Sequence, residues 1–332
     1  MFLLNPSSML FMFTLILGTV ITISSPTWFV SWLGLELNTL SFIPLIMHHK
    51  NSISSQAALK YFLIQALSSA TLMASAAMML LSTASPQIMI SLSLLLKMGA
   101  APLHFWLPPI MQSLPWIQCL ILMTIQKIAP MALMSYILSP VTSKVLMMAS
   151  IVSALVGGIG GLNQTLLRKI MAFSSINHMA WMLAALYMEK SLWLNYFLIY
   201  SIVSSSVVIL MNMNQIFHLK QLFFIPNNQM YKVSTLLSLF SLGGLPPLLG
   251  FIPKMMMTTF MAKNMLILWL LTLMMTALLT LFYYTRISIM SFMLTMPKYT
   301  MNFKENLNQK STSFLIINMI PIFSPLIVLI QF

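Results

Sequence analysis

Six ionisable residues lie inside apolar stretches of this 332-residue chain: Glu36, Lys60, Lys97, Lys127, His178 and Lys254. An ionisable side chain at bilayer depth costs about 2.5 to 3.5 kcal/mol on insertion scales, so it usually faces a bundle interior or a hydrated path and serves a function. Desolvation favours the neutral amine of a lysine, whereas a nearby carboxylate favours its ammonium ion. A row of lysines with one carboxylate can therefore exchange protons, and the pattern predicts an ion pathway.

Two of the lysines lie beside interruptions of an apolar run. Lys97 falls in SLSLLLKMGAAPLHFWLP, which Gly99 and Pro102 break, and Lys254 follows the Pro246-Pro247 pair in SLFSLGGLPPLLGFIPKMMM. Irregular backbone at bilayer depth survives only where protein or water satisfies its amides and carbonyls, and in transporters such broken helices mark ion sites. The sequence predicts two broken helices, each carrying a lysine of the pathway.

The composition places the chain among polytopic membrane proteins. With 59% hydrophobic and 6% charged residues, a soluble core could not bury this much apolar surface, and the apolar runs of about 20 residues have the length of transmembrane helices. The formal net charge of +13 could suggest nucleic acid, but the basic residues are scattered, so we expect no nucleic-acid binding.

The residue types also exclude several kinds of chemistry. Cys119 is the only cysteine, which excludes an internal disulfide and a cysteine-ligated cluster or zinc site within this chain. With no aspartate and three glutamates, a catalytic triad or paired-carboxylate site has little support. We expect no catalytic residue, no metal site and no cofactor in this chain.

We predict an all-α fold, a single integral membrane domain over residues 1–332 with about eleven transmembrane segments. They fall at 7–25, 27–47, 54–81, 86–112, 116–138, 142–162, 166–187, 191–215, 234–262, 265–290 and 312–332. The interrupted segments are the fourth and the ninth. An offset of five helices gives these two opposite orientations across the membrane, as in a transporter built from inverted five-helix repeats.

The loop charges predict the orientation of the segments. Most basic loop residues lie in even-numbered loops: Lys50, Arg168, Lys169, Lys220, Lys232, Lys298, Lys304 and Lys310. By the positive-inside rule, the N-terminus and the even loops face the cytoplasm or a mitochondrial matrix. An odd number of helices then sends the C-terminus to the opposite side.

Several of these residues also have a purely structural interpretation. Lys60 lies near a helix end and could extend its amine to the interface, Glu36 could be a counter-ion alone, and His178 could be a hydrogen-bonded packing residue. A glycine run that includes Gly157 and Gly160 resembles a phosphate loop only superficially. No strand precedes it, so close helix packing is the better interpretation.

Six strings that follow one another between Trp32 and Lys254 resemble a known family. They are WLGLELNTLSFIPL, LKYFLIQ, LLKMGAAPLHFWLP, QKIAP, GGLNQTLLRKIMAFSSINHMAW and FSLGGLPPLLGFIPK. They are similar to the antiporter-like membrane subunits of mitochondrial NADH:ubiquinone oxidoreductase, respiratory complex I. The resemblance covers nearly the whole chain, although the last 70 or so residues match only in hydropathy.

The resemblance implies a role for each residue of the predicted pathway. Glu36 matches the family's essential glutamate, Lys60 the lysine on the following helix, and Lys97 the lysine of the first broken helix. Lys127 matches the central connecting lysine, Lys254 the lysine of the second broken helix, and His178 a recurrent histidine. In the family, the glutamate modulates the first lysine and protons pass through the central lysine toward the last one.

The resemblance also implies location and partners. The chain would lie in the mitochondrial inner membrane, with its N-terminus on the matrix side and its C-terminus on the intermembrane-space side. Its partners would be neighbouring antiporter-like subunits and membrane lipids such as cardiolipin. NADH, FMN, iron–sulfur clusters and ubiquinone would be bound by other subunits.

We therefore expect a core membrane-arm subunit that takes part in proton translocation coupled to NADH oxidation and ubiquinone reduction elsewhere in the complex. The sequence leaves two alternatives open: a stand-alone cation/proton antiporter and a membrane scaffold subunit. Buried ionisable residues argue against a pure scaffold.

Overall fold

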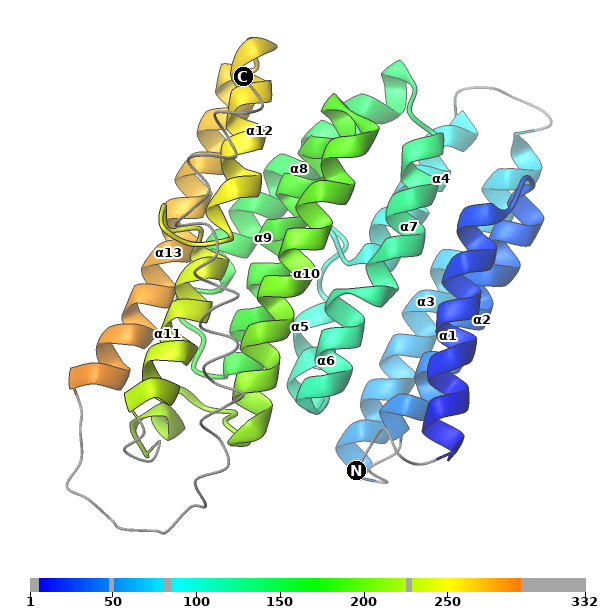
Figure 1. Cartoon of the computed structure of the whole chain (residues 1–332). Helices are drawn as coiled ribbons and strands as arrows, with labels where there is room; N and C mark the ends of the chain where they lie inside the picture. The colour runs from blue at the N-terminus through cyan, green and yellow to red at the C-terminus, as the bar shows by residue number, and fades with distance from the viewer. Residues whose placement is uncertain (1–5, 48–50, 80–84, 225–228, 294–332) are drawn as a thin grey trace. The chain divides into compact units, whose positions relative to one another are not determined.

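The computed structural model describes residues 6–47, 51–79, 85–224 and 229–293, and this part of the chain is almost entirely helical (Figure 1). The helices are α1 (Pro6–Ser24), α2 (Trp28–Met47), α3 (Ser52–Met78), α4 (Ser85–Met98), α5 (Leu107–Ser113), α6 (Trp116–Met123), α7 (Ile125–Tyr136), α8 (Pro140–Gly160), α9 (Leu167–Met188), α10 (Lys190–Met213), α11 (Gln229–Gly243), α12 (Phe251–Lys263) and α13 (Ile267–Met293), with a short 3₁₀ helix, η2 (Leu219–Phe224). Eight helical spans in the described ranges are long and apolar enough to cross a membrane. The all-α polytopic fold is confirmed.

The helices match the predicted segments, except that one segment predicted as a continuous helix is interrupted. Segments 86–112 and 234–262 are each divided into two helices, as predicted, but segment 116–138 is also divided, at Thr124. Thr124 has non-helical backbone angles, φ −116° and ψ −81°, and its hydroxyl donates to the Leu120 carbonyl at 2.7 Å. The segment predicted at 312–332 lies outside the described residues, so the total of eleven stays a prediction.

The first broken helix ends at a glycine in the left-handed conformation. Gly99 has φ +70°, its amide donates to the Leu96 carbonyl at 3.2 Å, and the next amide, of Ala100, donates to the Leu95 carbonyl at 3.1 Å. This pair of bonds is the Schellman motif, which satisfies carbonyls that a helix end would otherwise leave unpaired. Glycine is favoured because a Cβ atom is strained at this φ.

The second broken helix ends in the same way. Gly244 has φ +79°, its amide donates to the Ser241 carbonyl at 3.1 Å, and the Leu245 amide donates to the Phe240 carbonyl at 3.3 Å. The two predicted breaks therefore share a local structure that the glycines Gly99 and Gly244 determine.

The helices divide into two compact units, Met1–Ser153 and Ala154–Phe332. In the first unit, α1, α2, α3 and α4 pack in chain order, and α7 packs against α1, α2 and α4. In the second unit, α9 packs against α10, α12 and α13, and α11 packs against α10 and α13. Each unit contains one of the two predicted broken helices. The single domain over residues 1–332 stays a prediction.

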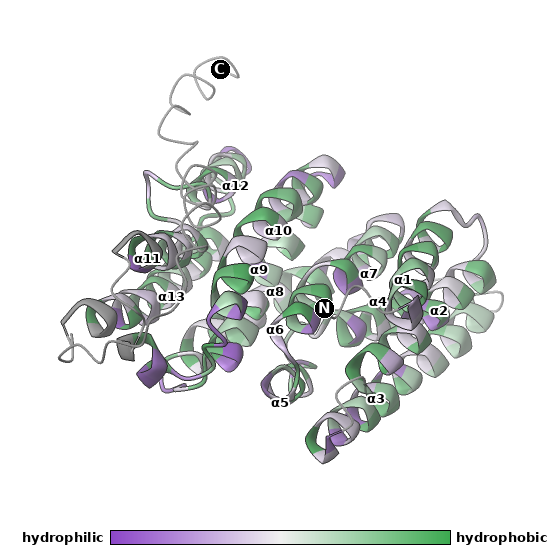
Figure 2. Cartoon of the chain, turned by 60° about the horizontal axis from the view of Figure 1, so that its bottom comes forward, coloured by the Kyte–Doolittle hydropathy of each residue, from purple (hydrophilic) through white to green (hydrophobic). Residues whose placement is uncertain are grey.

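The outer faces of the helices are apolar. Large hydrophobic side chains such as Phe13, Leu63 and Leu268 are exposed over 62%, 64% and 82% of their surface. Figure 2 shows hydrophobic residues along much of each helix, with hydrophilic residues interspersed among them. Such extensive apolar exposure is typical of a surface that lipid covers and not of a surface in water.

The glycine run at the end of α8 serves helix packing, as predicted. A Cβ atom on Gly157 would lie 2.7 Å from the Asn177 backbone nitrogen, and one on Gly160 would lie 2.4 Å from the Phe173 ring. Small residues here let α8 and α9 approach closely.

Gly250 provides the most sensitive test of the second break. A Cβ atom built on Gly250 would lie 1.7 Å from the Ser241 carbonyl oxygen, which is backbone and cannot rotate away. We expect Gly250→Ala to lower the free energy of unfolding by at least about 3 kcal/mol, or to prevent accumulation of the chain. Thermal unfolding and yield in mild detergent measure this.

The matched control is Gly158→Ala in α8, where the nearest atom to the new Cβ would be a leucine methyl, of Leu279, at 3.4 Å. This variant should unfold within about 0.5 kcal/mol of the original protein. Equal stability of the Gly250 and Gly158 variants would contradict the described turn.

Candidate functional site

Three lysines are buried in the described part of the chain, and each lies within about one turn of a helix break. Lys97, Lys127 and Lys254 expose only 6%, 2% and 6% of their surface. Lys97 is in the last turn of α4, Lys127 in the first turn of α7, and Lys254 near the start of α12. The predicted lysines of the pathway thus lie where some backbone amides and carbonyls have no hydrogen-bond partner within their own helix.

Side chains satisfy the backbone around Lys97. The Trp106 indole donates to the Leu96 carbonyl at 3.0 Å, and the Gln65 amide donates to the Lys97 carbonyl at 3.4 Å. The Lys97 Nζ atom, by contrast, has no hydrogen-bond partner among the described residues. The backbone is held in place, whereas no protein acceptor in the described part of the chain fixes the ammonium group.

The Glu36 carboxylate lies in the same unit as Lys97. Glu36 is half-buried on α2, and the Thr39 hydroxyl lies 3.2 Å from its Oε2 atom. Helix α2 packs against α3, and α3 packs against α4, which carries Lys97. No hydrogen bond joins the Lys97 Nζ atom to Glu36 in the described ranges, so their functional coupling stays a prediction.

Lys60 lies on the outer surface of the first unit. It is exposed on α3, beside the exposed residues Leu59 and Leu63, and no ion pair joins it to Glu36 in the described ranges. The approach of Glu36 and Lys60 that the sequence suggested is not observed, because Lys60 lies on the outward face of the helix. Its place in the pathway stays a prediction.

The inward position next to Lys60 is occupied by Tyr61. Its hydroxyl donates to the Oε1 atom of Gln126 at 3.2 Å, and its ring packs edge-on against Phe42 and Trp106 at 5.2 and 6.1 Å between centroids. Gln126 precedes Lys127 in the first turn of α7. A hydrogen bond thus connects α3 with the break at Thr124, where the central lysine lies.

Sequence reasoning missed Tyr61 and Gln126. The signal was present on α3, since Tyr61, Gln65 and Ser68 follow one another at helical spacing on the buried face. Polar groups repeated on a buried helix face in lipid need partners, so this spacing could have identified Tyr61, whereas Gln126 on α7 has no such signal beyond its position beside Lys127.

Lys254 has a defined acceptor in the second unit. Its Nζ atom donates to the Gly243 carbonyl oxygen at 2.8 Å, across the break from α12 to the end of α11. Gly244 allows this approach, because a Cβ atom there would lie 2.9 Å from Lys254 Cδ. The cation lies at a helix C-terminus, where the partial negative charge of the helix stabilises it by about 0.3 to 1 kcal/mol.

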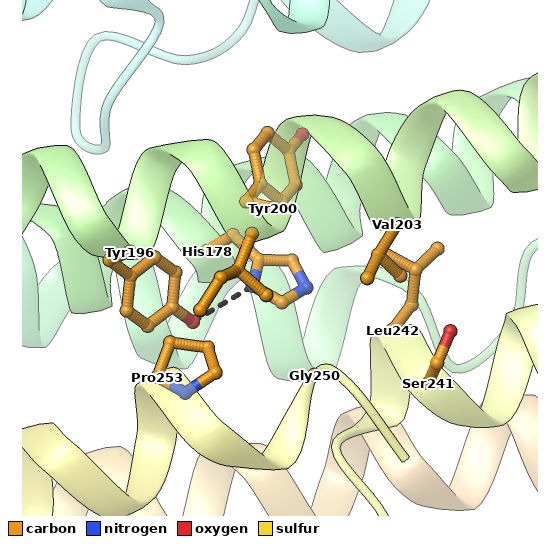
Figure 3. A pocket seen from close by; sticks show the side chains of 9 residues that line it. His178, Tyr196, Tyr200, Val203, Ser241, Leu242, Gly250 and Pro253 are labelled. Carbon is orange, nitrogen blue, oxygen red and sulfur yellow. Dashed lines mark hydrogen bonds between the residues drawn. The ribbon is translucent and has the colours of Figure 1, made fainter. Parts of the chain in front are cut away.

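His178 lies on α9 in the same unit and bonds a tyrosine of α10. Its Nδ1 atom is 2.9 Å from the Tyr196 hydroxyl oxygen, and its ring lies 4.9 Å from the Tyr200 ring. A small pocket adjoins the imidazole (Figure 3), lined by His178, Tyr196, Ile199, Tyr200, Val203, Ser241, Leu242, Gly250 and Pro253. The two tyrosines were not predicted, although their spacing of four residues within an apolar segment was visible.

The described side chains offer no metal site. Within residues 6–47, 51–79, 85–224 and 229–293, no three His, Cys, Asp or Glu residues come together. Cys119 is buried and its Sγ atom lies 3.5 Å from the Met111 carbonyl oxygen. The chemistry that this arrangement can carry out is the binding, release and transfer of protons at amine, carboxyl and imidazole groups.

Comparison with known proteins gives consistent matches. Residues 25–280 match the model of the family described as NADH:quinone oxidoreductase/Mrp antiporter, transmembrane. The chain is 44% identical to NADH-ubiquinone oxidoreductase chain 2 of Anopheles gambiae over 95% of each chain, and 38% identical to the Oryctolagus cuniculus protein of the same name over 98% of this chain and 96% of that one. A chain of respiratory complex I from Thermus thermophilus has the same fold, with a TM-score of 0.85 and 23% identity, covering 98% of this chain and 80% of that chain.

The contribution of the Tyr61–Gln126 hydrogen bond to the free energy of unfolding can be measured by mutation. Tyr61→Phe should lower the free energy of unfolding by about 1 kcal/mol, because it leaves a partly buried amide oxygen without its donor. In a Gln126→Met background the same change should cost less than about 0.5 kcal/mol, since the partner is already gone. Thermal unfolding in detergent measures both values.

Tyr136→Phe on α7 is the matched control, because Tyr136 is 60% exposed and its change should have no measurable effect. If Tyr61→Phe lowers the free energy of unfolding equally in the original protein and in the Gln126→Met variant, the Tyr61 hydroxyl does not act through Gln126.

Proposed function

Because the chain belongs to the family of NADH:quinone oxidoreductase and Mrp antiporter membrane subunits, we propose that it translocates protons as a membrane-arm subunit of mitochondrial respiratory complex I. NADH oxidation and ubiquinone reduction take place on other subunits, and this chain contributes to the H⁺-translocating part of that enzyme. It is a multi-pass mitochondrial membrane protein.

The observation that carries this proposal is the position of the three buried lysines at helix breaks. A lysine amine holds or releases a proton according to the charges and dipoles around it. At a helix break, backbone carbonyls and nearby side chains offer alternative partners, which an intact helix in lipid does not. Lys97, Lys127 and Lys254 are therefore placed where a proton can be held and passed on.

We propose that Glu36 controls the first step of the pathway. An ionised Glu36 carboxylate favours the ammonium form of Lys97, which has no fixed acceptor in the described part of the chain. When Glu36 gains a proton, this attraction is lost. The N–H bond of the Lys97 ammonium then breaks, and its proton passes through intervening water to the amine of Lys127, where a new N–H bond forms.

The route continues in the second unit at Lys254, which its hydrogen bond to the Gly243 carbonyl holds at the end of α11. His178 contributes a second proton-binding group in that unit, on the α9 side of the pocket. Lys60 is assigned to the outer part of the pathway, where its exposed amine could exchange protons with a neighbouring subunit.

The orientation follows from the basic loops. We place the N-terminus on the matrix side of the inner membrane and the C-terminus on the intermembrane-space side. Neighbouring antiporter-like subunits are the partners of the chain, and anionic lipids such as cardiolipin cover part of its apolar surface. The chain itself binds no redox cofactor in this proposal; NADH, FMN, iron–sulfur clusters and ubiquinone belong to other subunits.

One alternative has a specific observation in its favour. The matching family also includes Mrp antiporters, so a stand-alone cation/proton antiporter would use the same lysines with different partners. A scaffold role is disfavoured, because three buried lysines would destabilise a helical bundle without serving it.

Native electrophoresis distinguishes between a subunit of complex I and a stand-alone antiporter. Inner-membrane extracts in mild detergent are resolved, stained in the gel for NADH dehydrogenase activity, and each band is analysed by mass spectrometry for peptides of this chain. We expect the peptides in the large NADH-active band. Their presence only in a small assembly without NADH activity would favour the antiporter instead.

Neutralising the lysines tests the mechanism. In complexes reconstituted into liposomes, Lys97→Gln or Lys127→Gln should lower the number of protons translocated per NADH oxidised, because glutamine cannot bind or release a proton and this chain's contribution to the ratio is lost. Lys144→Gln is the control, since Lys144 is exposed on α8 and should leave the ratio unchanged. An unchanged proton-to-electron ratio in both buried variants would refute the proposed pathway.

A further inference from the structure

Helix α3 carries a single charged residue, Lys60, and this residue lies on its outward face. Helices α2, α4 and α5 pack against α3, whose buried face includes Tyr61 and Gln65. Lys60 is exposed, and its neighbours Leu59 and Leu63 expose 61% and 64% of their surface. The amine of Lys60 is therefore presented away from the helices of the first unit.

Lys60 lies within the membrane-spanning part of α3 and not at its end. The whole of α3, Ser52–Met78, is long and apolar enough to cross a membrane, and Lys60 follows its first residue by eight positions, or about 12 Å along the axis. On α1, by contrast, the exposed side chains from Met9 to Ile23 are all apolar. The charge of Lys60 therefore distinguishes the outward face of α3 from that of α1.

The first unit offers Lys60 no carboxylate partner among its described residues. Glu36 is the only acidic residue in positions 1–153, and its carboxylate accepts from the Thr39 hydroxyl at 3.2 Å. No ion pair joins it to Lys60 in the described ranges. An ammonium ion in an apolar environment is costly unless an opposite charge or a hydrogen-bond acceptor accompanies it. The partner of Lys60 is therefore expected outside this unit.

Leu59 and Leu63 alone would not make this face specific for a protein. Acyl chains are as apolar as leucine, so membrane helices gain little by exchanging one for the other, and polar contacts help to decide which helices associate. An ion pair supplies such a contact, because separating it leaves two unpaired charges in an apolar environment. Lys60 thus gives the outward face of α3 a preference for a helix of opposite charge.

We propose that the outward face of α3 around Lys60 is a docking surface for a transmembrane helix of a neighbouring complex I subunit, which places an aspartate or glutamate carboxylate against the Lys60 amine. The ion pair fixes the depth and rotation of that helix, and Leu59 and Leu63 pack against it. This inference rests on the proposed function, since the partner is a subunit of the membrane arm.

An exposed lysine can also satisfy its amine by extending along the helix to the lipid headgroups. Gln56, one turn before Lys60 and also exposed, lies in that direction. The two arrangements predict different effects of Lys60→Leu. With lipid around α3, the leucine removes a charge from the membrane and assembly does not fall. With a docked carboxylate, the leucine leaves that carboxylate unpaired and assembly falls.

The first test measures assembly of the intact complex by native electrophoresis of inner-membrane extracts. The readout is the share of this chain that migrates in the NADH-active band. We expect Lys60→Leu to lower that share at least about fivefold, because a buried charge that loses its partner is strongly destabilising. Lys60→Arg keeps the positive charge and should retain most of the original share. Lys144→Leu is the matched control, since Lys144 is exposed only four residues after the start of α8 and should leave assembly unchanged.

The second test uses the original complex, so it does not depend on the folding of a variant chain. A membrane-permeant carbodiimide activates carboxyl groups, and an amine in contact with an activated carboxyl forms an amide bond with it. Mass spectrometry should find the peptide that contains Lys60 joined to an aspartate or glutamate of another subunit. Lys60→Glu should then lower assembly, and a lysine at the linked position of the partner should restore it.

The outcomes separate this inference from the proposed function. Absence of the original chain from the NADH-active band overturns both. If the original chain migrates in that band, normal assembly of Lys60→Leu overturns the docking surface alone and leaves the buried lysines in the proposed pathway. A cross-link from Lys60 only to a glutamate of this same chain also overturns the docking surface, because the opposite charge would then be internal.

Discussion

An ammonium group inside a bilayer needs hydrogen-bond acceptors, and in an intact α-helix each carbonyl already accepts from an amide four residues on and keeps only its second lone pair for a side chain. Carbonyls without an amide partner from the same helix occur where a helix ends. The three buried lysines of this chain lie at such places: the end of α4, the junction of α6 and α7, and the break between α11 and α12. Among the described helices, the buried lysines therefore belong to discontinuous ones, whereas the continuous helices α3 and α8 carry exposed lysines, Lys60 and Lys144.

The lysines at the two glycine-terminated breaks differ in their hydrogen-bond acceptors. Lys254 follows its break and reaches back to the Gly243 carbonyl, so its ammonium has a fixed acceptor. Lys97 precedes its break, the neighbouring carbonyls accept from Trp106 and Gln65, and no acceptor among the described residues fixes its ammonium. A proton-binding group with a fixed partner resists change, whereas one without it follows the nearby charge. In the proposed mechanism, the first unit is therefore the more readily controlled of the two.

The sequence predicted the two breaks from Gly99 with Pro102 and from the Pro246-Pro247 pair. The structure shows that Gly99 and Gly244 end the helices, in a backbone conformation that other residues avoid. The sequence did not predict the break at Thr124, since a threonine that bonds a carbonyl one turn back is equally common within a helix. Nor could it choose between Lys60 and Tyr61. Adjacent residues on a helix point about 100° apart, so the direction of each depends on how α3 packs, which tertiary contacts decide. A lysine in a membrane segment is readily interpreted as functional, whereas the buried tyrosine beside it is readily interpreted as a core residue.

Each unit then pairs a lysine at a break with a tyrosine that orients a second polar group. In the first unit, the Tyr61 hydroxyl bonds Gln126 beside Lys127; in the second, the Tyr196 hydroxyl bonds His178 beside the pocket that Pro253 closes. Tyrosine suits both places because its ring fills an apolar site while its hydroxyl can donate or accept. Fixed neutral groups of this kind keep a path oriented without adding charge. In the proposed pathway, the charge among the described residues then changes at the buried lysines, Glu36 and His178, as stepwise proton transfer requires.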